Sequence, residues 1–179
     1  MDLRVERTIR SIKDAYYKLR AEKPLEKITV KELAELAYIN KATFYSHYED
    51  IYALADQIEN EFVASIIKNI PSPDELIANP RKSVEDLTNA LTENKDIGIL
   101  FSGSRAPFLE QKIESCLREQ ILKRYPEYEN SLKHEMVLSM LIHGGFHAFR
   151  QHAEPYNTQD VIQIMGDINE CIVDNFVRK

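Results

Sequence analysis

The stretch "INKATFYSHYEDIYAL", Ile39–Leu54, mixes aromatic and polar side chains. Phe44, Tyr45 and Tyr48 fall within five residues, and lysine, threonine, serine and histidine are interleaved with them. On a helix, Phe44 and Tyr48 lie one turn apart and share a face, whereas Tyr45 and its polar neighbours point elsewhere. The stretch therefore predicts a short helix with an apolar face for the core and a polar face for recognition.

Two further helices are predicted before this stretch. Apolar residues recur every three or four positions from Val5 to Leu19, and Pro24 ends this helix because proline cannot continue the hydrogen-bond ladder. Thr29 and Glu32 form a capping-box pattern at the start of the second helix, "VKELAELA". The residues expected to point inward from the second helix are Leu33, Leu36 and Ala37.

A turn at Tyr38 and Ile39 leads from the second helix to the third. Asn40 is a favourable N-cap for a third helix at residues 41–48, and Asp50 caps a fourth. Two short helices joined by a tight turn predict a helix-turn-helix, which places its second helix in the major groove of DNA.

The rest of the chain predicts further helices at residues 81–93, 107–124, 131–152 and 158–177. Prolines interrupt the chain at residues 71–75 and at Pro80. No segment shows the period-two alternation of a strand, so the sequence predicts an all-α fold. We expect a helix-turn-helix DNA-binding domain at residues 1–49. A helical regulatory and dimerisation domain is expected at residues 50–179, in which residues 50–70 form the connecting helix.

The composition is that of an ordinary globular protein, with 179 residues, 44% hydrophobic and 29% charged. Cys116 and Cys171 lack a metal-binding spacing and the first residues lack an apolar leader, so we expect a reduced, cytoplasmic protein. The longest uncharged apolar run, Met136–Phe149, is too short for a membrane helix.

The charge is unevenly distributed along the chain. Residues 1–48 carry ten Lys or Arg and seven Asp or Glu, which gives a net charge of +3. Residues 49–179 carry thirteen Lys or Arg and twenty-two Asp or Glu, which gives −9. The two ends are expected to meet different partners.

The outward face of the third helix suits contact with DNA. Lys41 can donate to guanine or phosphate, and Ala42 is small enough to approach a thymine methyl. Thr43, Tyr45 and His47 can donate to phosphate oxygens. With the caps included, the predicted DNA-binding residues are Thr29, Asn40, Lys41, Ala42, Thr43, Tyr45, Ser46 and His47. The alternative is a three-helix packing unit that has no role in DNA binding.

Residues Ile28–Leu54, "ITVKELAELAYINKATFYSHYEDIYAL", resemble the DNA-binding segment of the tetracycline-repressor-like (TetR/AcrR) transcriptional regulators. Tyr45 falls on the tyrosine that is near-diagnostic of that family, and the resemblance covers about Arg7–Ile58. Two positions differ from the family pattern. Tyr38 stands where glycine is common, so we expect a turn of a different type. Ile51 stands where a lysine often meets phosphate, so one backbone contact is expected to be missing.

The resemblance implies a homodimer that binds palindromic double-stranded DNA, with one helix-turn-helix per subunit in successive major grooves. It also implies a repressor that a small molecule in the C-terminal domain releases from its operator. The alternative is a regulator or activator whose C-terminal domain binds a protein partner. We expect neither an enzyme nor a cofactor or metal, because the sequence has no nucleophile motif, phosphate loop or metal cluster.

The ligand is expected between the central helices. His143 and His147 lie one helical turn apart, which is also a metal-ligand spacing, but no glutamate follows His143 to complete an HExxH motif. We therefore expect them to line a pocket or to pack. The expected pocket residues are Leu91, Phe101, Phe108, Leu117, Ile121, Met140, His143 and His147. A plain core is the alternative, and the acidic body favours an apolar or cationic ligand over an anion.

The last two long helices are expected to form the dimer interface. The helix at 131–152 carries apolar residues on more than one face, and the helix at 158–177 carries them at three- and four-residue spacing. Paired across a two-fold axis, the two helices would give a four-helix bundle. The predicted interface residues are Phe146, Phe149, Val161, Ile164, Met165, Ile168 and Ile172. A hairpin that packs only within one chain is the alternative.

Overall fold

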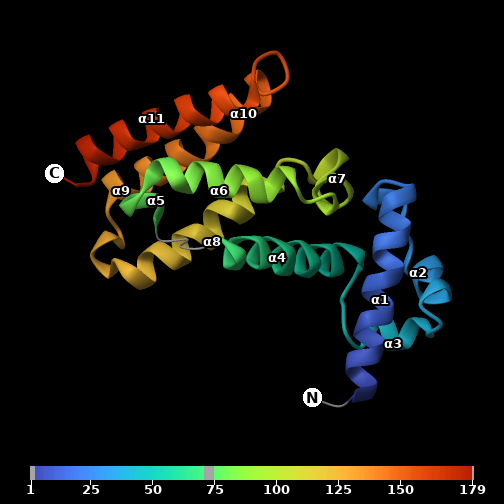
Figure 1. The fold of residues 1–179 in the computed structure, drawn as a ribbon. Coiled ribbons are helices and arrows are strands. Elements are labelled where there is room, and N and C mark those ends of the chain that lie inside the picture. Colours follow the sequence, from blue (N-terminus) through green and yellow to red (C-terminus); the bar gives the residue numbers. More distant parts are fainter. Residues whose placement is uncertain (1–2, 71–74, 179) are drawn as a thin grey trace. The chain divides into compact units, whose positions relative to one another are not determined.

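The computed structural model describes residues 3–70 and 75–178 and is all-α (Figure 1). Helices account for 81% of the structure, and the described ranges contain no strand, so the all-α prediction is confirmed. The chain forms two compact units. The first unit contains residues 1–62 and 95–107, and the second contains residues 63–94 and 108–179.

The first unit is built on four helices that follow one another in sequence. They are α1 (Leu3–Glu22), α2 (Val30–Leu36), α3 (Lys41–Tyr45) and the first part of α4 (Ile51–Asn69), with the short 3-10 turn η1 (Leu25–Lys27) between α1 and α2. Their fully buried side chains include Ile12, Tyr16, Leu33, Phe44 and Leu54. These positions form the apolar faces that the three- and four-residue spacing predicted.

One expected core residue of α2 is exposed. Leu36 is 39% exposed, whereas Ala34 is buried beside Leu33 and Ala37. Successive residues of an α-helix are rotated by about 100° around its axis, so Leu33, Ala34 and Ala37 share one face. Leu36 points about 110° away from the centre of that face. The prediction that Leu36 points inward was therefore wrong, because a seven-residue helix can bury only one such face.

A segment distant in sequence completes the first unit. It contains α7 (Asp96–Leu100) and the 3-10 turn η2 (Gly103–Arg105), and neither element was predicted. Arg20 of α1 is buried, and its guanidinium donates to the backbone oxygen of Leu100 at 3.1 Å and to Oγ of Ser102 at 3.0 Å. These hydrogen bonds hold the segment against α1.

A second buried arginine fastens the same segment to α4. Arg105 donates from Nε to Oε1 of Glu59 at 2.8 Å, and its second nitrogen binds Oε2 of the same carboxylate. Glu59 is fully buried and Arg105 is 8% exposed. The ring of Phe101 lies 6.2 Å from that of Phe62, which adds apolar contact. Residues 95–107 therefore belong with α1–α3 in the first unit.

The second unit is a set of helices that begins within α4. Its elements are α5 (Glu75–Ala78), α6 (Pro80–Thr92), α8 (Phe108–Arg124), the 3-10 turn η3 (Pro126–Tyr128), α9 (Leu132–Ser139), the π-helical turn η4 (Met140–Gly144), α10 (Gly145–His152) and α11 (Thr158–Phe176). Pro80, expected as a break, is the first residue of α6, where its missing N–H costs nothing. Residues 71–74 of the expected proline break lie outside the described residues. None of the described helices combines the length and the apolar character needed to cross a bilayer.

Two features shape the second unit. Gly166 of α11 lies so close to α6 that an added Cβ would sit 3.2 Å from Cα of Arg81, so glycine permits this approach. Arg81 forms ion pairs with Asp167 and Glu170 of α11. The helix expected at 131–152 contains a π turn from Met140 to Gly144, which widens the helix where two glycines lower helix propensity.

Candidate nucleic-acid interface

The start of α2 is fixed by one of the two hydrogen bonds of the predicted capping box. The hydroxyl of Thr29 accepts a hydrogen bond from the backbone N–H of Glu32 at 3.2 Å. The carboxylate of Glu32 accepts from the ammonium of Lys23. Thr29 is exposed, so its hydroxyl lies at the surface at the N-terminus of α2.

The turn between α2 and α3 has a left-handed residue at its centre. Tyr38 has a φ of 55°, and its N–H donates to the oxygen of Glu35 at 3.2 Å. The N–H of Ile39 donates to the oxygen of Ala34 at 3.0 Å. These two bonds make a Schellman motif, whose left-handed position is usually glycine. The expectation of a different turn type was therefore wrong: Tyr38 adopts the conformation that suits glycine.

The start of α3 is fixed by Asn40, as predicted. Its side-chain oxygen accepts from the backbone N–H of Thr43 at 2.7 Å and from the Thr43 hydroxyl at 3.0 Å. The Ser46 hydroxyl donates to the backbone oxygen of Thr43 at 2.7 Å. The hydroxyl protons of Thr43 and Ser46 are thus used within α3, and the oxygens remain available as acceptors.

The residues of α3 and the turn after it divide into a buried and an exposed set. Phe44 and Tyr48 are buried, and their ring centroids lie 5.7 Å apart. Lys41, Ala42, Tyr45 and Ser46 are exposed, and Thr43 and His47 are half-buried. Within the described ranges, the Lys41 ammonium and the Tyr45 hydroxyl have no hydrogen-bond partner in the chain. These two groups are free to bind another molecule.

The first turn of α4 is capped and contributes to the core. Asp50 caps it, as expected, since its carboxylate accepts from the N–H of Ala53 at 2.7 Å. Ile51, which stands where the family pattern often has a lysine, is buried in the core of the first unit. It falls three residues before Leu54, on the apolar face of α4. The next residue, Tyr52, is 51% exposed and presents a hydroxyl that the sequence analysis missed.

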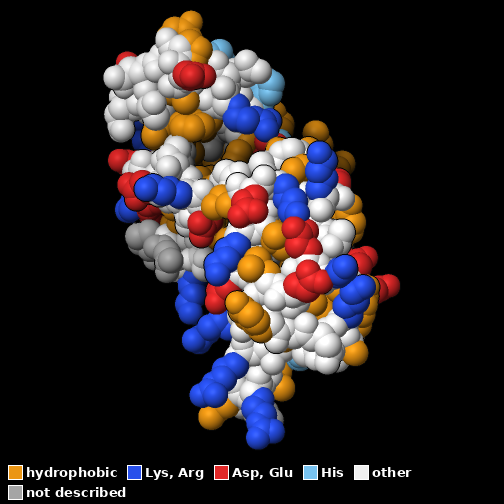
Figure 2. All heavy atoms as spheres, turned by 90° about the vertical axis from the view of Figure 1, so that its right-hand side faces the viewer, with side chains coloured by type: hydrophobic (Ala, Val, Ile, Leu, Met, Phe, Trp, Pro, Cys, Tyr) orange, Lys and Arg blue, Asp and Glu red, His pale blue; other side chains and the backbone are white. Residues whose placement is uncertain are grey.

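Basic residues gather at the start of α1. Arg4, Arg7 and Arg10 are exposed at three-residue spacing, with Glu6 the only acid among residues 3–10. Figure 2 shows Lys and Arg side chains at the lower end of this surface, where α1 begins, without red acidic side chains among them. The first turns of α1 therefore add positive charge to the first unit.

The residues expected around a ligand are distributed over both units. Phe101 belongs to the first unit, whereas the other seven belong to the second. Met140 is 59% exposed, Phe108 is 38% exposed and His147 is also at the surface. Leu117 and Ile121 are buried on α8 and Leu91 is half-buried on α6. Periodicity identified these residues as apolar, but it carried no information about which helix faces which.

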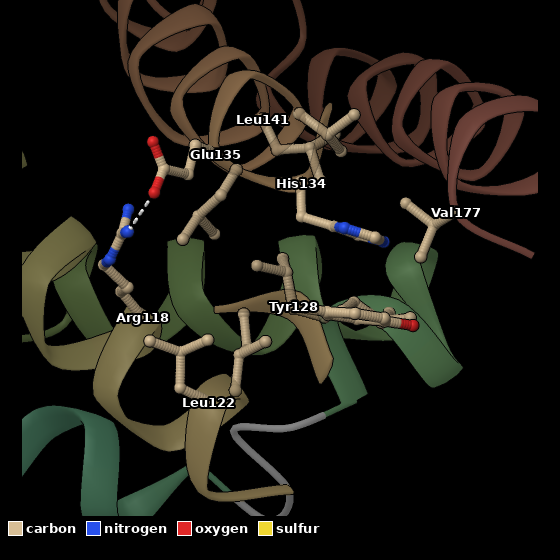
Figure 3. A pocket seen from close by; sticks show the side chains of 12 residues that line it. Arg118, Leu122, Tyr128, His134, Glu135, Leu141 and Val177 are labelled. Atoms are coloured by element: carbon tan, nitrogen blue, oxygen red, sulfur yellow. Dashed lines mark hydrogen bonds and ion pairs between the residues drawn. The ribbon is translucent and has the colours of Figure 1, made fainter. Parts of the chain in front are cut away.

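An apolar hollow in the second unit is lined by α5, α8, η3, α9, η4 and Val177, which follows α11 (Figure 3). Its cavity volume is about 30 Å³, well below the roughly 300–1,000 Å³ of ordinary small-molecule pockets. Arg118 binds Glu135 at 2.6 Å on one side, and the ring of Tyr128 stacks on His134 at 3.7 Å on the other. Of the predicted pocket residues, Ile121 lines this hollow. The hollow is too small for a metabolite as it stands.

A second, open hollow in the same unit has a volume of about 400 Å³. Ile66 of α4 and Ile70, which follows the end of α4, supply its apolar wall. Its other wall comes from α6 and the residues that follow, namely Asp86, Asn89, Ala90, Glu93 and Asn94. Two acids and no basic residue line it, so it suits a ligand that is apolar or cationic.

His143 is held by two carboxylates that the sequence analysis did not connect with it. Its ring nitrogens lie 2.8 Å from Glu114 and 3.3 Å from Glu110, both of α8. Hydrogen bonds that the His143 ring donates to the carboxylates of Glu114 and Glu110 raise the pKa of His143 above its usual value of 6.5. Arg150 binds Glu110 at 2.9 Å, and Ser139 donates to Glu114. Among the described residues, no group of three or more histidine, cysteine or acidic side chains is placed to hold a metal ion.

The predicted dimer residues lie at different depths. Ile164 and Ile168 of α11 are 58% and 53% exposed. Phe146, Phe149, Met165 and Ile172 are half-buried, and Val161 is buried. Leu132, Met136, Met140 and Phe176, apolar residues of the same two expected helices, are also exposed. Large apolar side chains on α9, η4 and α11 therefore remain uncovered in the single chain.

The chain matches no protein-family model, no curated protein and no solved structure.

Proposed function

We propose that this protein is a DNA-binding transcriptional regulator of the TetR/AcrR type, acting through a helix-turn-helix formed by α2 and α3. The observation that carries the proposal is the exposed face of α3 and its following turn. Lys41 and Tyr45 present an ammonium and a phenol to solvent while Phe44 and Tyr48 anchor the same helix in the core. Ammonium and phenol groups bind phosphate and base edges in DNA interfaces.

The proposal includes a homodimer, because one five-residue helix offers few base contacts. A dimer presents two copies of α3 to two half-sites related by a two-fold axis. Ile164 and Ile168 support this part, since large apolar side chains that are more than half exposed are better covered by a second copy.

Selection from a random library of DNA duplexes tests the proposal. Binding should enrich a motif with two-fold symmetry. Tyr45→Phe should weaken binding to all sequences similarly, because its hydroxyl donates to phosphate, whereas Lys41→Ala should also change the sequence preference. A selection that enriches no two-fold motif would refute the proposed function.

We further propose that a small apolar or cationic molecule releases the DNA by binding in the second unit. The open hollow beside Asp86 and Glu93 supports this ligand class. A ligand changes operator affinity only if it binds the DNA-bound and free states unequally, and about 1–3 kcal/mol of difference is typical. A thermal-shift screen of metabolites and lipophilic cations, with each hit retested for DNA release, examines this part of the proposal.

A second candidate is a regulator that a protein partner controls. The exposed side chains of Leu132, Met136 and Met140 favour it, because exposed large apolar side chains suit contact with a protein surface. The same screen separates the candidates. If small molecules stabilise the protein but none changes its affinity for the operator, control by a protein partner becomes the better account.

A further inference from the structure

Tyr38 has a backbone conformation that is unfavourable for tyrosine and lowers the stability of the fold. Its φ of 55° lies in the left-handed region, which β-carbon contacts make unfavourable for every residue except glycine. Its side chain is 95% exposed, more than any other large hydrophobic side chain in the described ranges. The ring therefore buries almost nothing in the chain. Glycine would suit the Schellman turn better. We therefore expect the tyrosine side chain to act by contacting another molecule.

The position of Tyr38 connects it with the proposed DNA-binding helix. It lies two residues before Asn40, the cap of α3, and three before Lys41. Consecutive Cα atoms are about 3.8 Å apart, so the Cα atoms of Tyr38 and Lys41 lie within about 11 Å of each other. The major groove is about 12 Å wide. A residue at this turn is therefore within reach of the phosphates that border a groove occupied by α3.

The chemistry of tyrosine suits such a phosphate. The phenol is a neutral donor at neutral pH, and protein–DNA hydrogen bonds go mostly to phosphate and sugar. We propose that Tyr38 donates its hydroxyl to a DNA phosphate beside the groove that α3 enters, and so positions the helix. This inference rests on the proposed function. Tyr38 would then be a positioning residue that carries no sequence information of its own.

The test uses the full chain and the duplex enriched from the random library. Tyr38→Phe keeps the ring and the turn but removes the donor, and should weaken binding about tenfold. The salt dependence should keep its slope, because a neutral group releases no counterion, whereas Lys41→Ala should reduce the slope by about one. Tyr156→Phe, at a tyrosine of the second unit that is 67% exposed, should leave affinity unchanged.

Tyr38→Gly should change thermal stability and DNA affinity in opposite directions. Relief of the left-handed strain should raise the melting temperature, while loss of the phenol should weaken DNA binding. Wild-type affinity in Tyr38→Phe and Tyr38→Gly would overturn this inference and leave the proposed function intact. A lower melting temperature for Tyr38→Gly would also overturn it, since the ring would then have a structural role. If the wild-type protein enriches no DNA, the proposed function fails and this inference fails with it.

Discussion

Arg105→Met should destabilise the first unit strongly. The substitution removes two guanidinium hydrogen bonds from the carboxylate of Glu59, which is fully buried and cannot gain water in exchange. Removing one partner of a buried ion pair costs about 3–5 kcal/mol, which lowers the folding equilibrium constant roughly 10²- to 10³-fold or more. Urea unfolding followed by circular dichroism measures the loss, with the midpoint and slope fitted for each transition.

Two further variants control this experiment. Replacing Glu59 and Arg105 together by methionine should recover most of the loss, because no charge then stays buried. Arg118→Met breaks a pair with Glu135 that has a similar geometry, at 2.6 Å, but side chains that are 39% and 41% exposed. It should cost at most about 1 kcal/mol. A loss for Arg105→Met as small as that for Arg118→Met would refute the argument, because it would show that water reaches Glu59.

Three further outcomes are expected. Ile51→Lys should lower the free energy of unfolding by at least about 2 kcal/mol, because the ammonium replaces a buried side chain; unchanged stability in thermal unfolding would show that Ile51 is exposed after all. Ile168→Glu should keep the fold, since Ile168 is 53% exposed, and should shift the protein from dimer to monomer in sedimentation; a wild-type chain that is monomeric at micromolar concentration contradicts the proposed dimer. His143→Gln should cost stability mainly at low pH. The pKa of His143 is raised by its carboxylate partners, so its stabilising effect is complete below the usual value of 6.5 and disappears as the pH rises through the raised pKa. Unfolding measured at several values between about pH 6 and pH 9 should show the two proteins converging, and a constant difference would mean that the charge of His143 contributes nothing.

Much of the fold was predictable because its signals are local. The caps at Thr29 and Asn40 depend on residues three positions away, and the structure has both bonds. The burial of Phe44 follows from its position one turn from Tyr48. Such features need only the helical repeat and a side chain of the right length, and both are written in the sequence.

The missed features depend on contacts between residues far apart in the chain. Periodicity on α8 could not indicate that Glu110 and Glu114 face His143, which follows about thirty residues later. Nor could it assign Phe101 to the first unit. The burial of Ile51, by contrast, follows from a local signal, because it lies three residues before Leu54 on the apolar face of α4. The exposed face of α3 was predictable, but its partner cannot be read from one chain.

Because residues 95–107 belong to the first unit, this unit cannot finish folding during synthesis until those residues have been made. The helices α1 to α4 leave the ribosome first, but the guanidinium that binds Glu59 follows 46 residues later. The backbone oxygen of Leu100, which accepts a hydrogen bond from Arg20, is synthesised 80 residues after that arginine. Closing contacts over such distances costs chain entropy, so the helix-turn-helix can form early while its support forms late. A fragment that ends after α4 would therefore be a poor substitute for the whole chain in binding assays.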